Sequence, residues 1–127
     1  MVQTTIVSVA SVQHLAENIL RIEIDRPVGF NFKPGQFARI GINPNNDNPD
    51  KIWRAQTIVS RAGEYKSLAF YIICIEGKPF SDALKKIKSG DEVYLDAVPY
   101  GHFTLDRFDS GGDLWLFSTG TGVAPYL

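Results

Sequence analysis

Three short segments of this sequence carry residues suited to binding phosphate. Arg54 has a guanidinium group, whose fork of N–H donors matches the oxygens of a phosphate. Gly77 lets the backbone come close to a ligand just before a predicted helix, where Ser81 and the first-turn amides can face a pyrophosphate. The turn Gly120-Thr121-Gly122 follows an apolar run and is of the kind that approaches a phosphate. The three segments together suggest a nucleotide ligand.

Each of these features also has a purely structural explanation. Arg54 can pair with an acidic side chain, and Ser81 can cap the helix as serine does in many proteins. The glycine-rich turn can be no more than a turn. The assignment therefore depends on the order of the segments and on the elements that position them.

The first hundred residues predict an all-β fold. Leu20, Ile22 and Ile24 alternate strictly with polar positions, as in a half-buried strand. Residues 43–50, rich in Asn, Asp and Pro, predict a surface loop. Similar reasoning gives six strands at residues 4–12, 19–24, 36–42, 54–60, 68–75 and 92–97, and a short extended piece at 103–105. Short strands with turns at regular spacing predict a six-stranded antiparallel Greek-key barrel.

One helix is expected in this part of the chain, over residues 80–88. Leu84 and Ile87 share one face, Ser81 is placed to cap the start, and Gly90 closes the end. A lone helix in such a fold is expected to cap one end of the barrel.

The pattern changes after residue 109, which divides the chain into two predicted domains, 1–109 and 110–127. Residues 110–112 read as a linker, and the apolar run 114–117 suits a strand buried on both faces of a parallel sheet. Because a βαβ unit needs roughly thirty residues, residues 110–127 are expected to hold only the truncated start of an α/β nucleotide-binding domain.

Composition excludes several classes of function. The 127 residues carry 13 Lys and Arg against 14 Asp and Glu, so no global field attracts nucleic acid or an anionic membrane. Cys74 alone can build neither a disulfide nor a thiolate metal site, and His14 and His102 lack clustered ligands. With no apparent leader, these features predict a cytoplasmic monomer without a metal.

The order of the motifs Arg54-Ala55-Gln56-Thr57, Gly77 to Ser81, Gly101-His102-Phe103 and Gly120 to Pro125 resembles the ferredoxin/flavodoxin–NADP(+) reductase family. The resemblance covers essentially the whole chain. It implies FAD as the cofactor, NADP(H) as the hydride partner of the full-length protein, and a ferredoxin or flavodoxin-like electron carrier.

The resemblance also implies roles for particular residues. Arg54, Gly77 and Ser81 would bind the pyrophosphate, Thr57 would act catalytically by hydrogen bonding near flavin N5, and the main chain at Tyr71 and Ile73 would hold the ribityl and AMP portions. Gly120, Thr121 and Gly122 would form the second nucleotide site. The family pattern is Arg-x-Tyr-Ser or Arg-x-Tyr-Thr, so Gln56 stands where a tyrosine would stack on the flavin.

The predicted function is thus the FAD-binding portion of such a reductase, and these 127 residues alone are expected to lack NADPH-dependent activity. Two alternatives remain open at this point. One is a flavin-binding module without catalysis. The other is a relative such as a siderophore ferric reductase or the flavin half of an oxygenase reductase.

Overall fold

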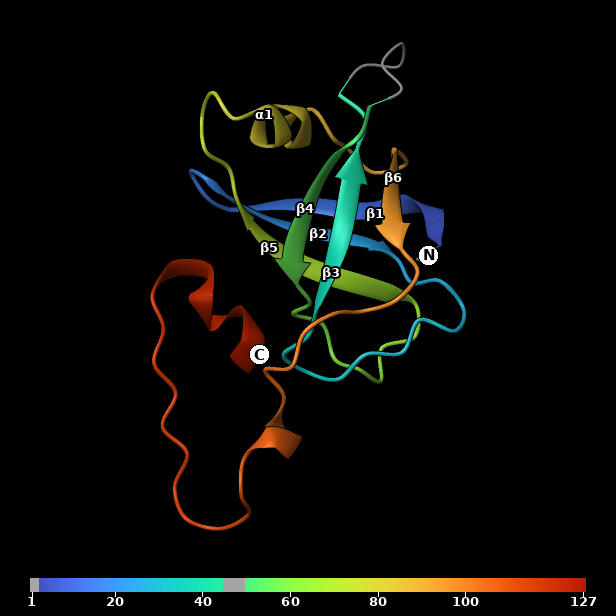
Figure 1. Cartoon of the computed structure of the whole chain (residues 1–127). Helices are drawn as coiled ribbons and strands as arrows, with labels where there is room; N and C mark the ends of the chain where they lie inside the picture. The colour runs from blue at the N-terminus through green and yellow to red at the C-terminus, as the bar shows by residue number, and fades with distance from the viewer. Residues whose placement is uncertain (1–2, 45–49) are drawn as a thin grey trace.

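A single antiparallel sheet of six strands forms the body of the protein (Figure 1). The computed structural model describes residues 3–44 and 50–127, so most of the predicted loop at 43–50 lies outside the described residues. The strands are β1 (Thr4–Ala16), β2 (Ile19–Asp25), β3 (Phe37–Ile42), β4 (Ile52–Thr57), β5 (Ser67–Ile73) and β6 (Glu92–Asp96). Their order in the sheet is β4-β3-β6-β1-β2-β5. The predicted fold class is confirmed.

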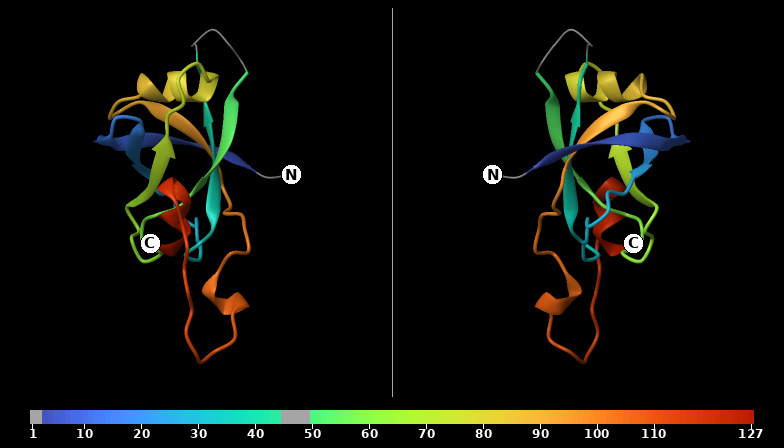
Figure 2. Two further views of the ribbon diagram at one scale, coloured as in Figure 1. Left: turned by 90° about the vertical axis from the view of Figure 1, so that its left-hand side faces the viewer. Right: turned by 90° about the vertical axis from the view of Figure 1, so that its right-hand side faces the viewer.

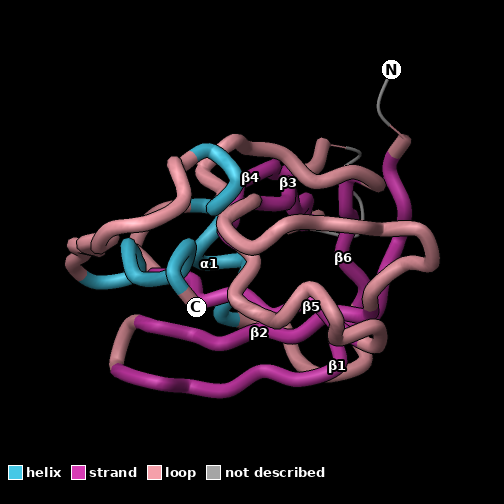
Figure 3. Tube along the Cα trace, turned by 90° about the horizontal axis from the view of Figure 1, so that it is seen from below, coloured by secondary structure: helices cyan, strands magenta, loops and turns pink. Residues whose placement is uncertain are grey.

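The sheet curls until its two edge strands approach each other. Seen from below, β3, β4 and β6 form one wall and β1, β2 and β5 the other (Figure 3). An isolated bridge joins Ile58 to Phe70, and the Val59 amide donates to the Ala69 carbonyl over 2.8 Å. Within the described chain, pairing between the two edges is limited to this point. The barrel is therefore only partly closed.

The core fills the space inside this curled sheet. Alternate residues of the strands point inward, as Leu20, Ile22 and Ile24 do on β2, each at most 3% exposed. Phe70 and Leu95 are fully buried. The alternation read from the sequence therefore marks the inner face correctly.

The β1–β2 hairpin is longer and tighter than predicted. β1 continues to Ala16, which pairs with Ile19, so Glu17 and Asn18 alone make the turn. His14 pairs with Leu20 on β2, and the register shifts at Leu15 before Ala16 pairs with Ile19. The sequence prediction had ended the first strand at residue 12.

The helix α1 (Pro79–Lys85) covers one end of the barrel (Figure 1). Pro79 occupies its first turn, a position where the missing N–H costs nothing. Leu84 is buried and Ile87 packs against the core, as the spacing predicts. The prediction that Ser81 caps the helix is wrong, because Lys78 is the N-cap residue and no side chain caps the start.

The C-terminal segment, residues 101–127, extends away from the barrel and turns back to it (Figure 2). It holds two short 3-10 helices, η1 (Leu105–Arg107) and η2 (Gly120–Tyr126). The predicted strand at 114–117 is wrong, since these residues form no strand and pair with no strand in the described chain. Trp115 is 76% and Phe117 78% exposed. A strand buried on both faces requires neighbouring strands, and residues 114–117 have none in the described chain.

Candidate functional site

The register of β4 against β3 sets the direction of its side chains. Arg54 lies opposite Ile40 and Gln56 opposite Ala38. Directly opposed residues in a sheet share a face, and Ile40 and Ala38 are 3% and 0% exposed. Arg54 and Gln56 therefore point to the same side of β4. Because β4 is an edge strand, these side chains lie at the rim of the barrel.

Arg54 reaches the first turn of helix α1. Its guanidinium carbon lies 5.8 Å from the ring centroid of Phe80, the second residue of the helix. The Arg54 side chain is exposed, and one of its nitrogens donates to the Trp53 carbonyl over 2.7 Å. The structure thus brings together Arg54 and the Gly77–Ser81 segment, as the phosphate-binding hypothesis requires.

The turn that enters helix α1 is held by Ser81. The Ser81 side chain is buried, and its hydroxyl oxygen accepts a hydrogen bond of 2.9 Å from the Ile75 amide. Gly77 has a φ of +80°, and nothing lies within 4 Å of the position of an added Cβ. Ser81 therefore fixes the shape of this turn from inside. The first-turn amides of Phe80 and Ser81 have no partner within the helix, as is general for the first turn of an α-helix, so they can donate to a ligand.

Tyr71 and Ile73 lie on β5, which forms the other edge of the sheet. Tyr71 pairs with Arg21 and is half-buried, whereas Ile73 pairs with Ile19 and is 39% exposed. The main chain of this strand thus runs into the turn at 74–78 that leads to α1. Both residues lie on the edge of the barrel that faces β4.

Thr57 ends β4 beside an aromatic pair that the sequence did not reveal. It lies opposite Phe37, whose ring stacks on Tyr100 at a centroid distance of 5.8 Å. The backbones of Phe37 and Tyr100 exchange hydrogen bonds of 2.9 and 2.8 Å. Gly101 follows with a φ of +106°, and an added Cβ there would lie 3.1 Å from the Phe37 ring. The Gly101 motif therefore supports the end of β4 that carries Thr57.

A buried carboxylate stabilises the same region. Asp96 is 4% exposed, and it accepts hydrogen bonds from the Tyr100 hydroxyl at 2.9 Å and from Arg39 at 3.2 Å. Burial of Tyr100, together with its bond to Asp96, raises the pKa of the Tyr100 phenol above its usual value. Arg39 also covers the Trp53 ring at 5.4 Å. Sequence reasoning missed this cluster, because its members come from three strands and the turn after β6.

The second predicted phosphate site lies elsewhere. Gly120, Thr121 and Gly122 belong to η2, which contacts β5, whereas α1 covers the opposite end of the barrel (Figures 1 and 2). Ala124 is buried and anchors η2. The structure therefore does not bring the glycine-rich turn to Arg54 and Ser81.

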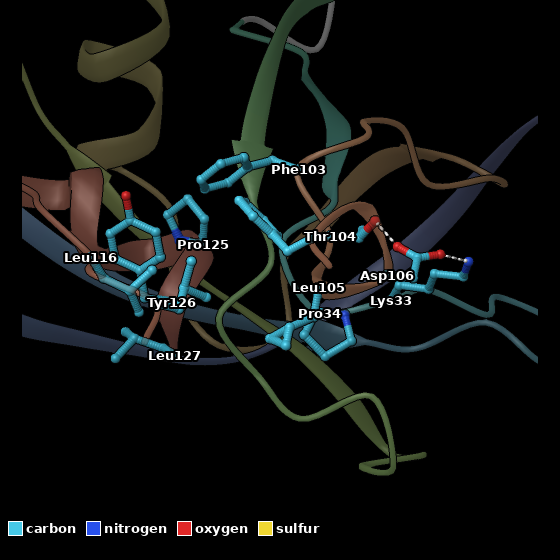
Figure 4. A pocket seen from close by; sticks show the side chains of 12 residues that line it. Lys33, Pro34, Phe103, Thr104, Leu105, Asp106, Leu116, Pro125, Tyr126 and Leu127 are labelled. Atoms are coloured by element: carbon cyan, nitrogen blue, oxygen red, sulfur yellow. Dashed lines mark hydrogen bonds and ion pairs between the residues drawn. The ribbon is translucent and has the colours of Figure 1, made fainter. Parts of the chain in front are cut away.

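A cavity of about 400 Å³ lies between the two limbs of the C-terminal segment, beside Lys33 and Pro34 of the loop before β3 (Figure 4). Its walls are mostly apolar and include Phe103, Leu116 and Tyr126, with the rings of Phe103 and Tyr126 5.9 Å apart. At its rim, Lys33 donates to Asp106 over 2.8 Å, and Thr104 bonds the same carboxylate. These bonds, that of Lys33 foremost, lower the pKa of Asp106 to about 2. Nothing in the sequence pattern indicates this contact, whose partners are 73 residues apart.

The donors along β4 and at the start of α1 fit a phosphorylated ring cofactor. Arg54 and the first-turn amides are suited to an anion, while the Gln56 amide and Thr57 hydroxyl are suited to the polar atoms of a ring. No group of three or more metal-ligating side chains occurs among residues 3–44 and 50–127. No helix in that part of the chain is long and apolar enough to span a bilayer.

Comparison with known proteins identifies relatives over nearly the whole chain. A flavodoxin/ferredoxin–NADP reductase from Rhodobacter capsulatus is 34% identical over 119 residues, which cover 94% of this chain and 43% of that protein. A second, from Buchnera aphidicola subsp. Schizaphis graminum, is 37% identical over 120 residues, 90% of this chain and 44% of that protein. The chain therefore spans less than half the length of these relatives. No family model matches it.

Comparison with solved structures identifies a protein of the same kind. A ferredoxin NADP+ reductase from Neisseria gonorrhoeae, solved with bound FAD and NADP, superposes with a TM-score of 0.91 at 31% identity. The match covers 99% of this chain and 50% of that one. The resemblance inferred from the order of the motifs is confirmed.

Proposed function

We propose that this chain, a relative of the ferredoxin/flavodoxin–NADP(+) reductases over nearly its whole length, supplies the FAD-binding portion of such a reductase. The observation that carries the proposal is the convergence of Arg54 with the first turn of α1 at the rim of a reductase-like barrel. A fixed cation beside helical amides is the arrangement that an anionic pyrophosphate requires.

We assign different portions of FAD to different residues of β4, β5 and α1. Arg54 would direct its remaining N–H donors at the pyrophosphate, to which the amides of Phe80 and Ser81 would also donate. The Ser81 hydroxyl holds the turn at Ile75 and so positions those amides. The main chain of β5 at Tyr71 and Ile73 would hold the ribityl and AMP portions.

Thr57 is the residue we propose to act at the reacting end. Its hydroxyl can donate a hydrogen bond to a ring nitrogen, and the Phe37–Tyr100 pair behind it keeps the end of β4 in place. When bound, FAD supplies the exchange between two-electron hydride transfer and one-electron transfer. The protein contributes orientation and electrostatics.

The activity of the complete reductase is a wider proposal. NADP(H) would be its hydride partner and a ferredoxin or flavodoxin-like carrier its one-electron partner, in keeping with the names of the relatives. Gly120, Thr121 and Gly122 would belong to the NADP(H) site. We propose that the protein acts in the cytoplasm.

Titration with FAD tests the proposal. Arg54→Ala removes a charge-assisted contact with the pyrophosphate, so we expect FAD binding to weaken by about 1.5–3 kcal/mol. Lys85→Ala is the matched control, because Lys85 is an exposed cation at the other end of the same helix. Equal losses in the two variants, or no FAD binding by the parent protein, would contradict the proposal.

A further inference from the structure

The side chain of Gln56 differs from that of the neighbouring Gln36. Gln36 uses both ends of its amide: the oxygen accepts from the Lys33 amide at 2.8 Å, and the nitrogen donates to the Gly101 carbonyl at 3.1 Å. Both glutamines are half-buried. The Gln56 side chain makes no hydrogen bond with any part of the chain that the structure describes. The Gln36 amide is thus hydrogen-bonded through both its oxygen and its nitrogen, whereas the Gln56 amide has no hydrogen-bonding partner in the described chain.

The amide atoms of Gln56 are open to solvent, because no enclosed side-chain polar atom among the described residues lacks a hydrogen-bond partner. A ligand can therefore pair with this amide without displacing any contact of the described chain. Gln56 is also placed where a ligand would lie. It shares the face of β4 with Arg54, which reaches the first turn of α1, and it lies two residues further along the strand.

We propose that the Gln56 amide hydrogen-bonds the polar edge of the flavin ring, instead of stacking on its face. This inference rests on the proposed function, because it assumes that FAD binds along β4. A primary amide offers two N–H donors and a carbonyl acceptor. The polar edge of a flavin carries two carbonyls on either side of one N–H, so a primary amide can pair with the N–H and one of the carbonyls. An aromatic ring at position 56 could stack but could not form these bonds.

Two substitutions separate hydrogen bonding from simple packing. Gln56→Met keeps the length and flexibility of the side chain and removes the amide, while Gln56→Glu keeps the planar shape and removes the donors. Gln13→Met serves as control, because Gln13 is an exposed glutamine on β1. Each variant of the 127-residue protein is titrated with FAD, and the absorption and fluorescence of the bound flavin are recorded.

We expect Gln56→Met to weaken FAD binding about 2- to 10-fold, which corresponds to one or two neutral hydrogen bonds. Gln56→Glu should weaken it further, because a carboxylate would face the carbonyls of the ring. Both changes should shift the absorption bands of bound flavin, which a purely structural role would leave in place. Gln13→Met should bind as the parent does.

The outcomes distinguish this inference from the proposed function. If the parent binds FAD and both Gln56 variants bind it equally well with unchanged bands, the inference is wrong and the FAD site stands. If Gln56→Glu alone retains the parent affinity, the amide acts through its planar surface, and the hydrogen-bonding assignment is overturned. If the parent does not bind FAD, the proposed function itself fails.

Discussion

The barrel and the C-terminal segment differ in how far their apolar side chains are buried. The barrel, residues 3–100 as far as they are described, contains the whole hydrophobic core, from Val7 to Leu95. In residues 101–127, Ala124 is the buried apolar side chain, while Trp115 and Phe117 are more than three-quarters exposed. The two regions are similarly rich in large apolar residues. Burial therefore depends on having partners, and only the barrel supplies its own.

Few contacts join the two regions. Gly35 has a φ of +99°, and an added Cβ there would lie 1.9 Å from the Phe103 carbonyl oxygen. The Lys33–Asp106 ion pair lies beside it. The loop before β3 thus provides both a close backbone contact and a charge contact for the segment. Two pairs of variants and one single variant can test how far the two regions are independent.

The largest difference is expected between two phenylalanines. Phe70 is fully buried and Phe117 is 78% exposed. Phe70→Ala should lower the free energy of unfolding by about 3–5 kcal/mol, because it leaves a cavity in the core. Phe117→Ala should change it by less than about 0.5 kcal/mol, as for most surface substitutions. Urea unfolding measures both, and a loss of several kcal/mol for Phe117→Ala would mean that the segment contributes to the core.

A smaller effect is expected where the regions meet. Gly35→Ala places a side chain at a positive φ and against the Phe103 carbonyl, so it should cost about 1–3 kcal/mol. The segment can move away, which keeps the loss below that of Phe70→Ala. Gly111→Ala is the control, because Gly111 also has a positive φ, of +91°, but open space around it.

Proteolysis distinguishes the two glycine variants further. Gly35→Ala should speed cleavage within residues 101–117, because the segment loses its close contact with the barrel. Gly111→Ala should leave cleavage there nearly unchanged. Equal rates for the two variants would show that the contact at Gly35 does not hold the segment.

The barrel was predicted well from the sequence, because the patterns that mark its strands and its helix lie within single segments. Strict alternation in β2 and the Leu84–Ile87 pair in α1 each mark an inner face without reference to the rest of the chain. The wrong predictions concern residues whose structure depends on hydrogen-bonding partners elsewhere in the chain. The strand expected at 114–117 needs neighbouring strands. The Ser81 hydroxyl, expected to cap the helix, instead accepts a hydrogen bond from the Ile75 amide.

The candidate site shows the same division. The motif containing Arg54 and the helix at Phe80 were found from residue types, and in the structure Arg54 lies over the Phe80 ring. The supporting contacts were not found. Phe37 and Tyr100 are 63 residues apart in sequence order and stack only because β3 forms a bridge with the turn after β6. Asp96 looks like any strand carboxylate until Arg39 and Tyr100 are placed beside it.

The smallest expected effect concerns the charge contact between the regions, and it depends on pH. Lys33 holds the pKa of Asp106 at about 2, below the ordinary 3.8. Because the folded-state pKa is depressed, the contact contributes fully above pH 3.8 and is lost as the pH falls through 2. NMR signals of Thr104 and Arg107 should therefore titrate with a midpoint near 2. In Lys33→Met the midpoint should rise toward 3.8, since the first cause of the shift is removed. The ion pair is exposed, so global stability should change little, as is usual for surface pairs. A parent midpoint already at 3.8 would mean that Lys33 and Asp106 do not hold the segment to the barrel.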